Sequence, residues 1–535
     1  MRSSSSPNVL VIMTDQERYP PPYETAEVAA YRRTHMPARE RLRETSVELH
    51  RHYTGATACV PSRATLFTGQ YPSLHGAANT DGLAKSATDP GVSWLDADSV
   101  PTLGDWFRAA GYRTHYRGKW HLSHPDLLVP GTHSALMTND TAGTVLDQAV
   151  DLYRRTDRLD GFGFSGWIGR EPHGAHPADT GFVRDGLFAD QVCDLFEQLS
   201  HARDAGPWCT VASFVNPHDI VFSGLGWQVL GFPPPPDDVP DVPEAPSQAD
   251  GFEGRPRCQE QFRDTWTAML YEQPTDVGYR RFYHWLHALV DVAIARVLDA
   301  LDASGMADDT IVVLTADHGE MLGAHGGLQQ KWHNAFDETI RVPCLVSGPG
   351  IEPADISIPT SHVDLLPTLL GLCGIEPDEA LEQVGRHHTE AHPLVGRDLS
   401  AVVTGSIDAA EADAPVYFMT EDQISEGLRQ VNIIDHVPFD AVERPAKVEA
   451  VITHLPTGDG GAPELWKLAR TYDRLHSDPE EDGSGWELHH LTVDPEERTN
   501  LASGAPHAPV AELRAVLGAA RERVRLVPRH RTPTQ

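Results

Sequence analysis

The sequence predicts an α/β fold built on a large, mostly parallel sheet flanked by helices. Short apolar runs rich in β-branched residues alternate with segments of helical periodicity, which is the pattern of βαβ units. Four of these runs have the length and composition of buried strands, namely 8–14, 112–117, 209–215 and 310–316. Segment 281–305 is predicted to be a long amphipathic helix that ends near Gly305 and leads into the last of these strands.

Two segments of biased composition organise the rest of the chain. The stretch 231–246 is rich in proline and acidic residues, so it cannot form a helix or a central strand and is expected at the surface. A second stretch, 407–415, predicts a boundary between a large α/β domain over 1–406 and a smaller domain over 407–535. The smaller domain is strongly acidic and ends in a basic tail, because its last 35 residues hold six Arg and two Glu.

The composition excludes several classes of protein. With 43 basic and 77 acidic residues the net charge is −34, which argues against binding to nucleic acid or to an anionic membrane surface. No apolar run approaches the roughly 20 residues of a membrane span, and the first apolar run, 9–13, is too short for the core of a signal peptide. We therefore expect a cytoplasmic protein. Its six scattered cysteines contain no CxxC pair, which predicts free thiols.

Polar residues follow each of the four predicted strands. The side chains able to bind a ligand or take part in catalysis are Asp15 and Gln16 after the first strand, Lys119 and His121 after the second, His218 after the third, and Asp317 and His318 after the fourth. Taken singly, an Asp after a strand is usually a helix cap, and a His in a loop is usually a hydrogen-bonded surface residue. Because functional sites form at the carboxyl ends of parallel strands, the whole set predicts one shared site.

Segment 57–76 adds a candidate nucleophile. In Cys59-Val60-Pro61-Ser62-Arg63, the proline suits the first turn of a helix, which places Cys59 at a helix N-terminus where unpaired N–H groups favour anions. Arg63, one turn further on, can brace an anion or the nucleophile. From the residues alone, Cys59 is either a nucleophile of low pKa or a buried structural cysteine.

This segment resembles the signature of the sulfatase family, in which Cys-x-Pro-Ser-Arg marks a cysteine that is oxidised to formylglycine after synthesis. Residues 66–69 match that signature, and 111–121 resembles the second signature of the family. Asp15, the Asp317-His318 pair and Lys331 match the remaining site motifs in order, and 486–502 resembles the closing strand and turn. The resemblance implies an alkaline-phosphatase-like fold whose smaller C-terminal α+β domain contains a four-stranded antiparallel sheet.

The sequence departs from the pattern of many sulfatases at two positions. Asp15 is followed by Gln16 where many members have a second Asp, and His318 stands where many have Asn. This combination resembles the branch that contains choline sulfatases, arylsulfatases and phosphonate monoester hydrolases. The resemblance implies a divalent metal held by Asp15, Gln16, Asp317 and His318 beside Cys59. The oxygen-rich donor set suits Ca²⁺, Mg²⁺ or Mn²⁺ better than Zn²⁺, and the resemblance implies Ca²⁺, with Mn²⁺ or Mg²⁺ as alternatives.

The resemblance also implies a mechanism. A hydrated formylglycine at position 59 would attack the sulfur of a sulfate ester, with one hydroxyl deprotonated by Asp317. The other side chains of the set would bind or transfer protons: Lys331 and His218 at the leaving group, His121 at the departing sulfate, and Lys119 and Arg63 at the diol and the transferring group. Three basic side chains and a divalent ion against two carboxylates leave about +3 in the pocket, which suits an anionic ester.

Two alternatives remain open at this point. A phosphonate monoester or phosphodiester hydrolase would use the same site, although Lys119 and His121 favour the sulfatase. A catalytically silent binding protein would retain the fold without turnover, and the complete set of site residues argues against it. The expected partners are a small sulfate ester and, during maturation, a formylglycine-generating enzyme, and a homo-oligomer is left open.

Overall fold

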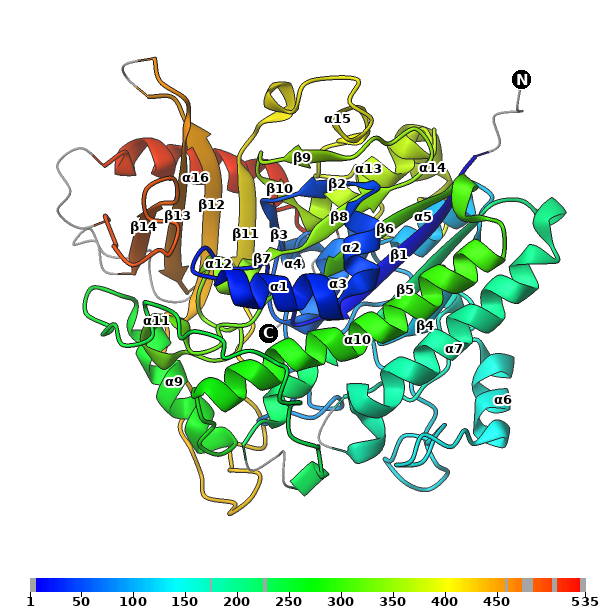
Figure 1. The fold of residues 1–535 in the computed structure, drawn as a ribbon, viewed down its shortest axis with the longest axis horizontal. Helices are drawn as coiled ribbons and strands as arrows, with labels where there is room; N and C mark the ends of the chain where they lie inside the picture. The colour runs from blue at the N-terminus through cyan, green and yellow to red at the C-terminus, as the bar shows by residue number, and fades with distance from the viewer. Residues whose placement is uncertain are drawn as a thin grey trace.

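A seven-stranded mixed sheet forms the centre of the computed structural model, which describes residues 6–173, 176–224, 229–457, 460–473, 485–502 and 508–529. Its strands lie in the order β4-β5-β1-β6-β8-β2-β9 (Figure 1). They are β1 (Asn8–Asp15), β2 (Ser46–Leu49), β4 (Arg113–Gly118), β5 (Trp208–Pro217), β6 (Thr310–Ala316), β8 (Cys344–Ser347) and β9 (Ala354–Ile356). The four predicted strands, β4, β5, β1 and β6, are parallel neighbours, whereas β8 pairs antiparallel with β6 and β2. The predicted fold class is confirmed.

Strand β1 is buried on both of its faces. Val9, Val11 and Met13 belong to one apolar core, and Leu10 and Ile12 belong to the core on the opposite side of the sheet. This is why β1 is a continuous apolar run in the sequence rather than an alternating one. Helices cover each face, with α2 (Pro37–Arg43), α7 (Gly181–Ser200) and α10 (Val277–Ala303) on one side and α3 (Cys59–Thr68), α5 (Leu103–Ala109), α13 (His362–Leu372) and α14 (Pro377–Val384) on the other.

The long helix α10 crosses the sheet beside α7 (Figure 1). It begins after Asp276, whose side chain accepts the N–H of Tyr279, and it leads into β6 as predicted. The proline-rich stretch 231–246 contains neither a helix nor a strand. It is anchored to the domain, since its Val239 packs with Tyr31 and Met36. Further short helices are α1 (Ala26–His35), α4 (Pro72–His75), α6 (Asp147–Thr156), α9 (Arg257–Met269), α12 (Asp337–Ile340) and α15 (Ser400–Val403).

The C-terminal part contains a four-stranded antiparallel sheet of order β11-β12-β13-β14, as the resemblance implied. Its strands are β11 (Val416–Thr420), β12 (Lys447–Leu455), β13 (Glu464–Tyr472) and β14 (Trp486–His490), and α16 (Val510–Val524) packs on one face (Figure 1). The opposite face shares a core with Tyr53 and Ile340 of the large domain. The boundary at residue 406 stays a prediction.

Two smaller features complete the fold. A three-stranded sheet of β3 (His52–Tyr53), β7 (Arg341–Val342) and β10 (Thr360–Ser361) was not predicted. Within the described part of the basic tail, Arg521 and Arg525 lie 2.8 and 3.8 Å from Glu449 of β12, and the backbone N–H of Arg529 donates to Glu390. Residues 530–535 of the tail lie outside the described residues.

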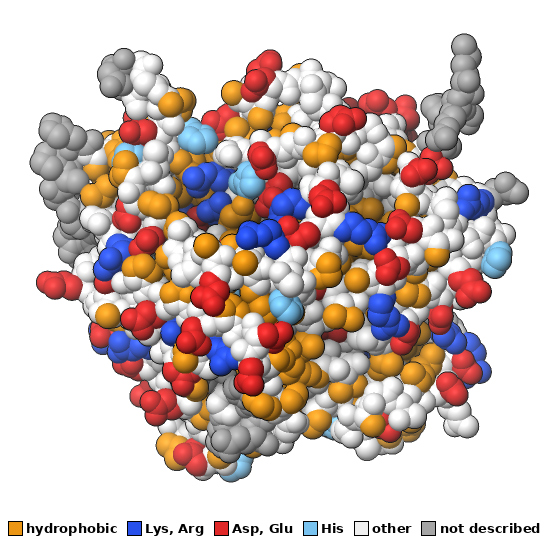
Figure 2. Space-filling view, in the orientation of Figure 1, with side chains coloured by type: hydrophobic (Ala, Val, Ile, Leu, Met, Phe, Trp, Pro, Cys, Tyr) orange, Lys and Arg blue, Asp and Glu red, His pale blue; other side chains and the backbone are white. Residues whose placement is uncertain are grey.

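The surface mixes charges of both signs. Figure 2 shows basic side chains interspersed with acidic ones on the face that carries α1 and α10. Within the described ranges, no helix is both long and apolar enough to cross a membrane. All six cysteines are free thiols, in agreement with the sequence. The cytoplasmic location stays a prediction.

Candidate active site

The predicted site residues converge at the carboxyl edge of the parallel strands. Asp15 is the last residue of β1, Asp317 directly follows β6, and His218 directly follows β5. Cys59 is the first residue of α3, which confirms the helix predicted from Pro61. Helix α3 is buried along its whole length, so the sheet and the helix hold these side chains in fixed positions.

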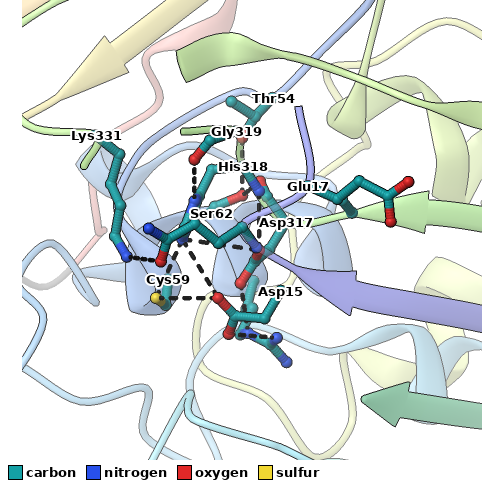
Figure 3. A network of polar contacts seen from close by, with 12 residues as sticks. Asp15, Glu17, Thr54, Cys59, Ser62, Asp317, His318, Gly319 and Lys331 are labelled. Carbon is teal, nitrogen blue, oxygen red and sulfur yellow. Dashed lines mark hydrogen bonds and ion pairs between the residues drawn. The ribbon is translucent and has the colours of Figure 1, made fainter. Parts of the chain in front are cut away.

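Four side chains form a buried group that can hold a metal ion. Asp15, Cys59, Asp317 and His318 each offer one ligand atom, and these atoms all lie within 4.8 Å of one another. The Sγ of Cys59 lies 3.1 Å from Nε2 of His318 and 3.8 Å from Oδ1 of Asp15. Figure 3 shows Cys59 and Asp15 pointing toward one another, Lys331 reaching toward the same cluster, and Glu17 pointing away.

The donor set of this cluster fits a divalent cation. The Nδ1 of His318 lies 3.0 Å from the carbonyl oxygen of Gly319 and donates to it. The lone pair of the neutral ring is then on Nε2, which faces Cys59 and Asp15. Burial and the nearby Lys331 lower the pKa of His318, so the imidazole is neutral and able to act as a ligand. Two carboxylates and one neutral imidazole suit Ca²⁺, Mg²⁺ or Mn²⁺.

Arg63 braces the two carboxylates of the cluster. Its Nε donates to Oδ2 of Asp317 at 2.9 Å and its second terminal nitrogen donates to Oδ2 of Asp15 at 3.0 Å. The remaining terminal nitrogen donates to the carbonyl of Lys119 and the hydroxyl of Ser213. Arg63 therefore holds two like charges side by side.

Burial sets the protonation of the central groups. Burial alone would keep Asp15 neutral, but Lys119, His218 and Arg63 hold its pKa well below the usual range. Burial and the neighbouring Asp15 raise the pKa of Asp317 to about 6. The same two causes raise the pKa of the Cys59 thiol to about 12. The interpretation of Cys59 as a low-pKa thiolate therefore does not fit the structure.

Gln16 and Lys331 form a contact of their own beside the cluster. The Nζ of Lys331 donates to Oε1 of Gln16 at 2.7 Å, and Nε2 of Gln16 donates to Gln330 and to Glu320. The backbone N–H of Gln16 donates to Asp317 at 3.0 Å. The residue thus borders the cluster, and its role as a metal ligand stays a prediction.

His121 lies apart from the metal cluster. Its Nε2 is 2.8 Å from Oδ1 of Asp81, and its ring is 4.3 Å from that of His173. Asp81 and Glu320 are neighbours of the site that were assigned no role from the sequence. Glu320 stands next to the Asp317-His318 motif and could have been suspected, whereas nothing in the sequence marks Asp81.

The fold gathers two carboxylates, an imidazole and a cysteine in one buried cluster at the carboxyl edge of the parallel strands, the place where α/β enzymes hold their active sites. The sulfatase family model matches residues 7–375. The chain therefore belongs to the sulfatase family and is a sulfuric ester hydrolase.

Individual relatives agree with this assignment. The choline-sulfatase of Rhizobium meliloti is 29% identical over 398 residues, which cover 70% of this chain and 69% of the relative. The uncharacterized sulfatase YidJ of Escherichia coli matches with the same identity and coverage. The crystal structure of the phosphonate monoester hydrolase of Agrobacterium radiobacter superposes with a TM-score of 0.60 at 20% identity, covering 97% of this chain and 96% of that one. At this identity the structural likeness shows the shared fold.

Proposed function

We propose that the protein hydrolyses a sulfate ester with a hydrated formylglycine made from Cys59, releasing inorganic sulfate and an alcohol or phenol. The observation that carries this proposal is the position of the Cys59 side chain. It lies at the N-terminus of α3, 3.1 Å from His318 and 3.8 Å from Asp15, inside the group of donors that fits a cation. The relatives that act on sulfate esters support the same reaction.

A divalent metal completes the proposed site. Asp15, Asp317 and His318 would hold it, with Gln16 as a further oxygen donor, and we propose Ca²⁺ with Mn²⁺ or Mg²⁺ as alternatives. When bound, the ion polarises the oxygens of residue 59 and of the sulfate group. Lys119, whose Nζ lies 2.6 Å from Asp15, and Arg63 keep the ligand carboxylates ionised and in place.

In the first half-reaction, Asp317 accepts a proton from one hydroxyl of residue 59 as that oxygen attacks the sulfur. A new O–S bond forms and the S–O bond to the alcohol breaks. Lys331 and His218 bind the leaving oxygen and return a proton to it. Lys331 and Asp15 both lie close enough to His218 to shift its pKa, which supports a leaving group bound on the side of the cluster where His218 and Lys331 lie.

In the second half-reaction, the other hydroxyl of residue 59 loses its proton to His121. The C=O bond of the aldehyde forms again, the bond between its carbon and the sulfate oxygen breaks, and sulfate departs. Burial and His173 lower the pKa of His121 to about 3, so its ring is neutral and can accept the proton.

Modification of Cys59 requires a second protein. The thiol is 2% exposed in the folded chain, so a formylglycine-generating enzyme has to reach it before folding is complete. Intact-mass spectrometry after coexpression with such an enzyme tests this step. The thiol should be replaced by an aldehyde, and a Cys59 that stays a thiol would refute the mechanism.

The competing function is a phosphonate monoester or phosphodiester hydrolase with the same site, and the fold similarity to such an enzyme favours testing it. We expect a higher kcat/KM for an aryl sulfate than for a phenyl phosphonate ester on the formylglycine-bearing enzyme. A large advantage for the phosphonate ester would overturn the sulfatase assignment. Absence of turnover on both esters would indicate the silent binding protein.

A further inference from the structure

A second group of titratable side chains lies next to the proposed catalytic groups. Asp81, in the loop after α4, lies 2.8 Å through Oδ1 from Nε2 of His121. Nε2 of His173 lies 3.5 Å from the same oxygen, and the two imidazole rings are 4.3 Å apart. Asp81 and His121 are 6% and 1% exposed. One buried carboxylate therefore faces two imidazoles. Asp81 is not a member of the metal cluster and has no role in the two half-reactions proposed for the site.

This contact determines which nitrogen of His121 carries the proton. Burial alone would favour the neutral acid, but His173 and the hydrogen bond from His121 hold the pKa of Asp81 below its usual range. An ionised carboxylate can only accept, so Nε2 of His121 donates to it. The neutral ring then carries its lone pair on Nδ1. In the part of the chain that the structure describes, this Nδ1 is buried and has no hydrogen-bond partner.

The arrangement is unfavourable for stability taken alone. A buried acceptor without a partner destabilises the folded state, and His121 adopts a φ of 56°, in the left-handed region that is strained for residues other than glycine. The charge of Lys119 helps to lower the pKa of His121, and Lys119 itself contacts Asp15 of the metal cluster. A strained residue with a free proton acceptor, two residues from Lys119, indicates a role in the reaction.

We propose that Asp81 is a positioning residue that fixes His121 in the tautomer whose Nδ1 accepts a proton in the second half-reaction. The inference rests on the proposed function. The proton leaves the free hydroxyl of residue 59 for Nδ1, and the electron pair of that O–H bond forms the C=O bond. The bond between the carbon and the sulfate oxygen breaks, and sulfate leaves with its electron pair. Asp81 gains and loses no proton in this step.

The test separates the two half-reactions on the metal-loaded, formylglycine-bearing enzyme with 4-nitrophenyl sulfate. In Asp81→Asn we expect the first turnover to release nitrophenol at a rate within about threefold of wild type. Steady-state turnover should fall about a hundredfold. Intact-mass spectrometry of the working enzyme should then show a sulfo group retained on the protein. Asp89→Asn is the matched control, because Asp89 lies on the same loop and accepts from the backbone N–H groups of Gly91 and Leu428.

A double-mutant cycle guards against a merely structural effect. If Asp81 acts only through His121, Asp81→Asn should change nothing further in a His121→Ala background. An equal loss of release and turnover without sulfated enzyme, or the same loss in both backgrounds, would overturn the proposal. Turnover of Asp81→Asn at the wild-type rate would overturn it as well. A wild-type enzyme that releases no nitrophenol would instead refute the proposed function itself.

Discussion

The Nζ of Lys119 lies 2.6 Å from Oδ2 of Asp15, and both side chains are fully buried. Lys119 follows β4 and Asp15 ends β1, with β5 between them in the sheet. The pair therefore ties two strand ends together across a third. A buried ion pair of this kind is costly to break, because the surviving charge loses its counterion without regaining water.

Replacing Lys119 by Met should affect both activity and stability. We expect kcat/KM for an aryl sulfate to fall at least about a hundredfold, because the proposed site loses a fixed positive charge. The metal-free protein should lose about 3 kcal/mol of unfolding free energy in urea. Lys119→Arg should not restore activity, since the guanidinium does not fit the space of an ammonium. Arg386→Ala, which removes an exposed pair with Glu382, should change stability by less than about 1 kcal/mol.

His318 is expected to control which metal is preferred rather than whether catalysis occurs. His318→Asn replaces the nitrogen donor by an oxygen donor in a cluster whose other members are two carboxylates and Cys59. Affinity for Mn²⁺ should fall about tenfold, whereas Ca²⁺ should still bind. Metal content after equilibrium dialysis and activity with each ion give the measurement. Equal loss of both ions would show that His318 does more than select between them.

Chelation should destabilise the protein through the same cluster. A ligand that binds only the folded state at 100 times its Kd adds about 2.7 kcal/mol of stability. We therefore expect the Tm of the wild type to rise when Ca²⁺ is added after removal of metal with a chelator. Asp317→Asn should abolish this rise, because it removes one of the two carboxylates. A metal-dependent rise that survives in Asp317→Asn would place the ion elsewhere.

The sequence was sufficient for the parallel core and for the residues at its edge. Strands β1 and β6 are buried on both faces, so they read as apolar runs, and the abrupt change to polar residues at Asp15 and Asp317 marks the ends of the strands. The helix beginning at Cys59 was likewise predictable, because Pro61 suits a first turn. These are local signals that tertiary packing does not override.

The contacts that orient the site depend on tertiary structure and left no local signal. Asp81 is 40 residues from His121 in the chain and meets it only because two loops fold together. The three-stranded sheet escaped prediction for a related reason, since strands of two residues, such as His52–Tyr53, are too short to show a period. The hydrogen bond that Gln16 donates to Gln330 and the one that it accepts from Lys331 likewise join residues that are distant in sequence.

Stability should depend on pH through a carboxyl group outside the active site. Glu487 of β14 is buried and accepts from Gln259, and burial raises its pKa to about 7 from 4.5. Between these two values the folded state holds a proton that the unfolded state has released, so stability falls as pH rises and then levels off above the folded pKa, by about 3 kcal/mol at most. Glu487→Gln should remove this fall. In urea denaturation, the free energy of unfolding of the variant should therefore rise relative to that of the wild type between about pH 5 and about pH 8. Glu512→Gln, at an exposed position of α16, is the control and should follow the wild type. An equal difference between Glu487→Gln and wild type at both pH values would show that the carboxyl does not titrate on unfolding.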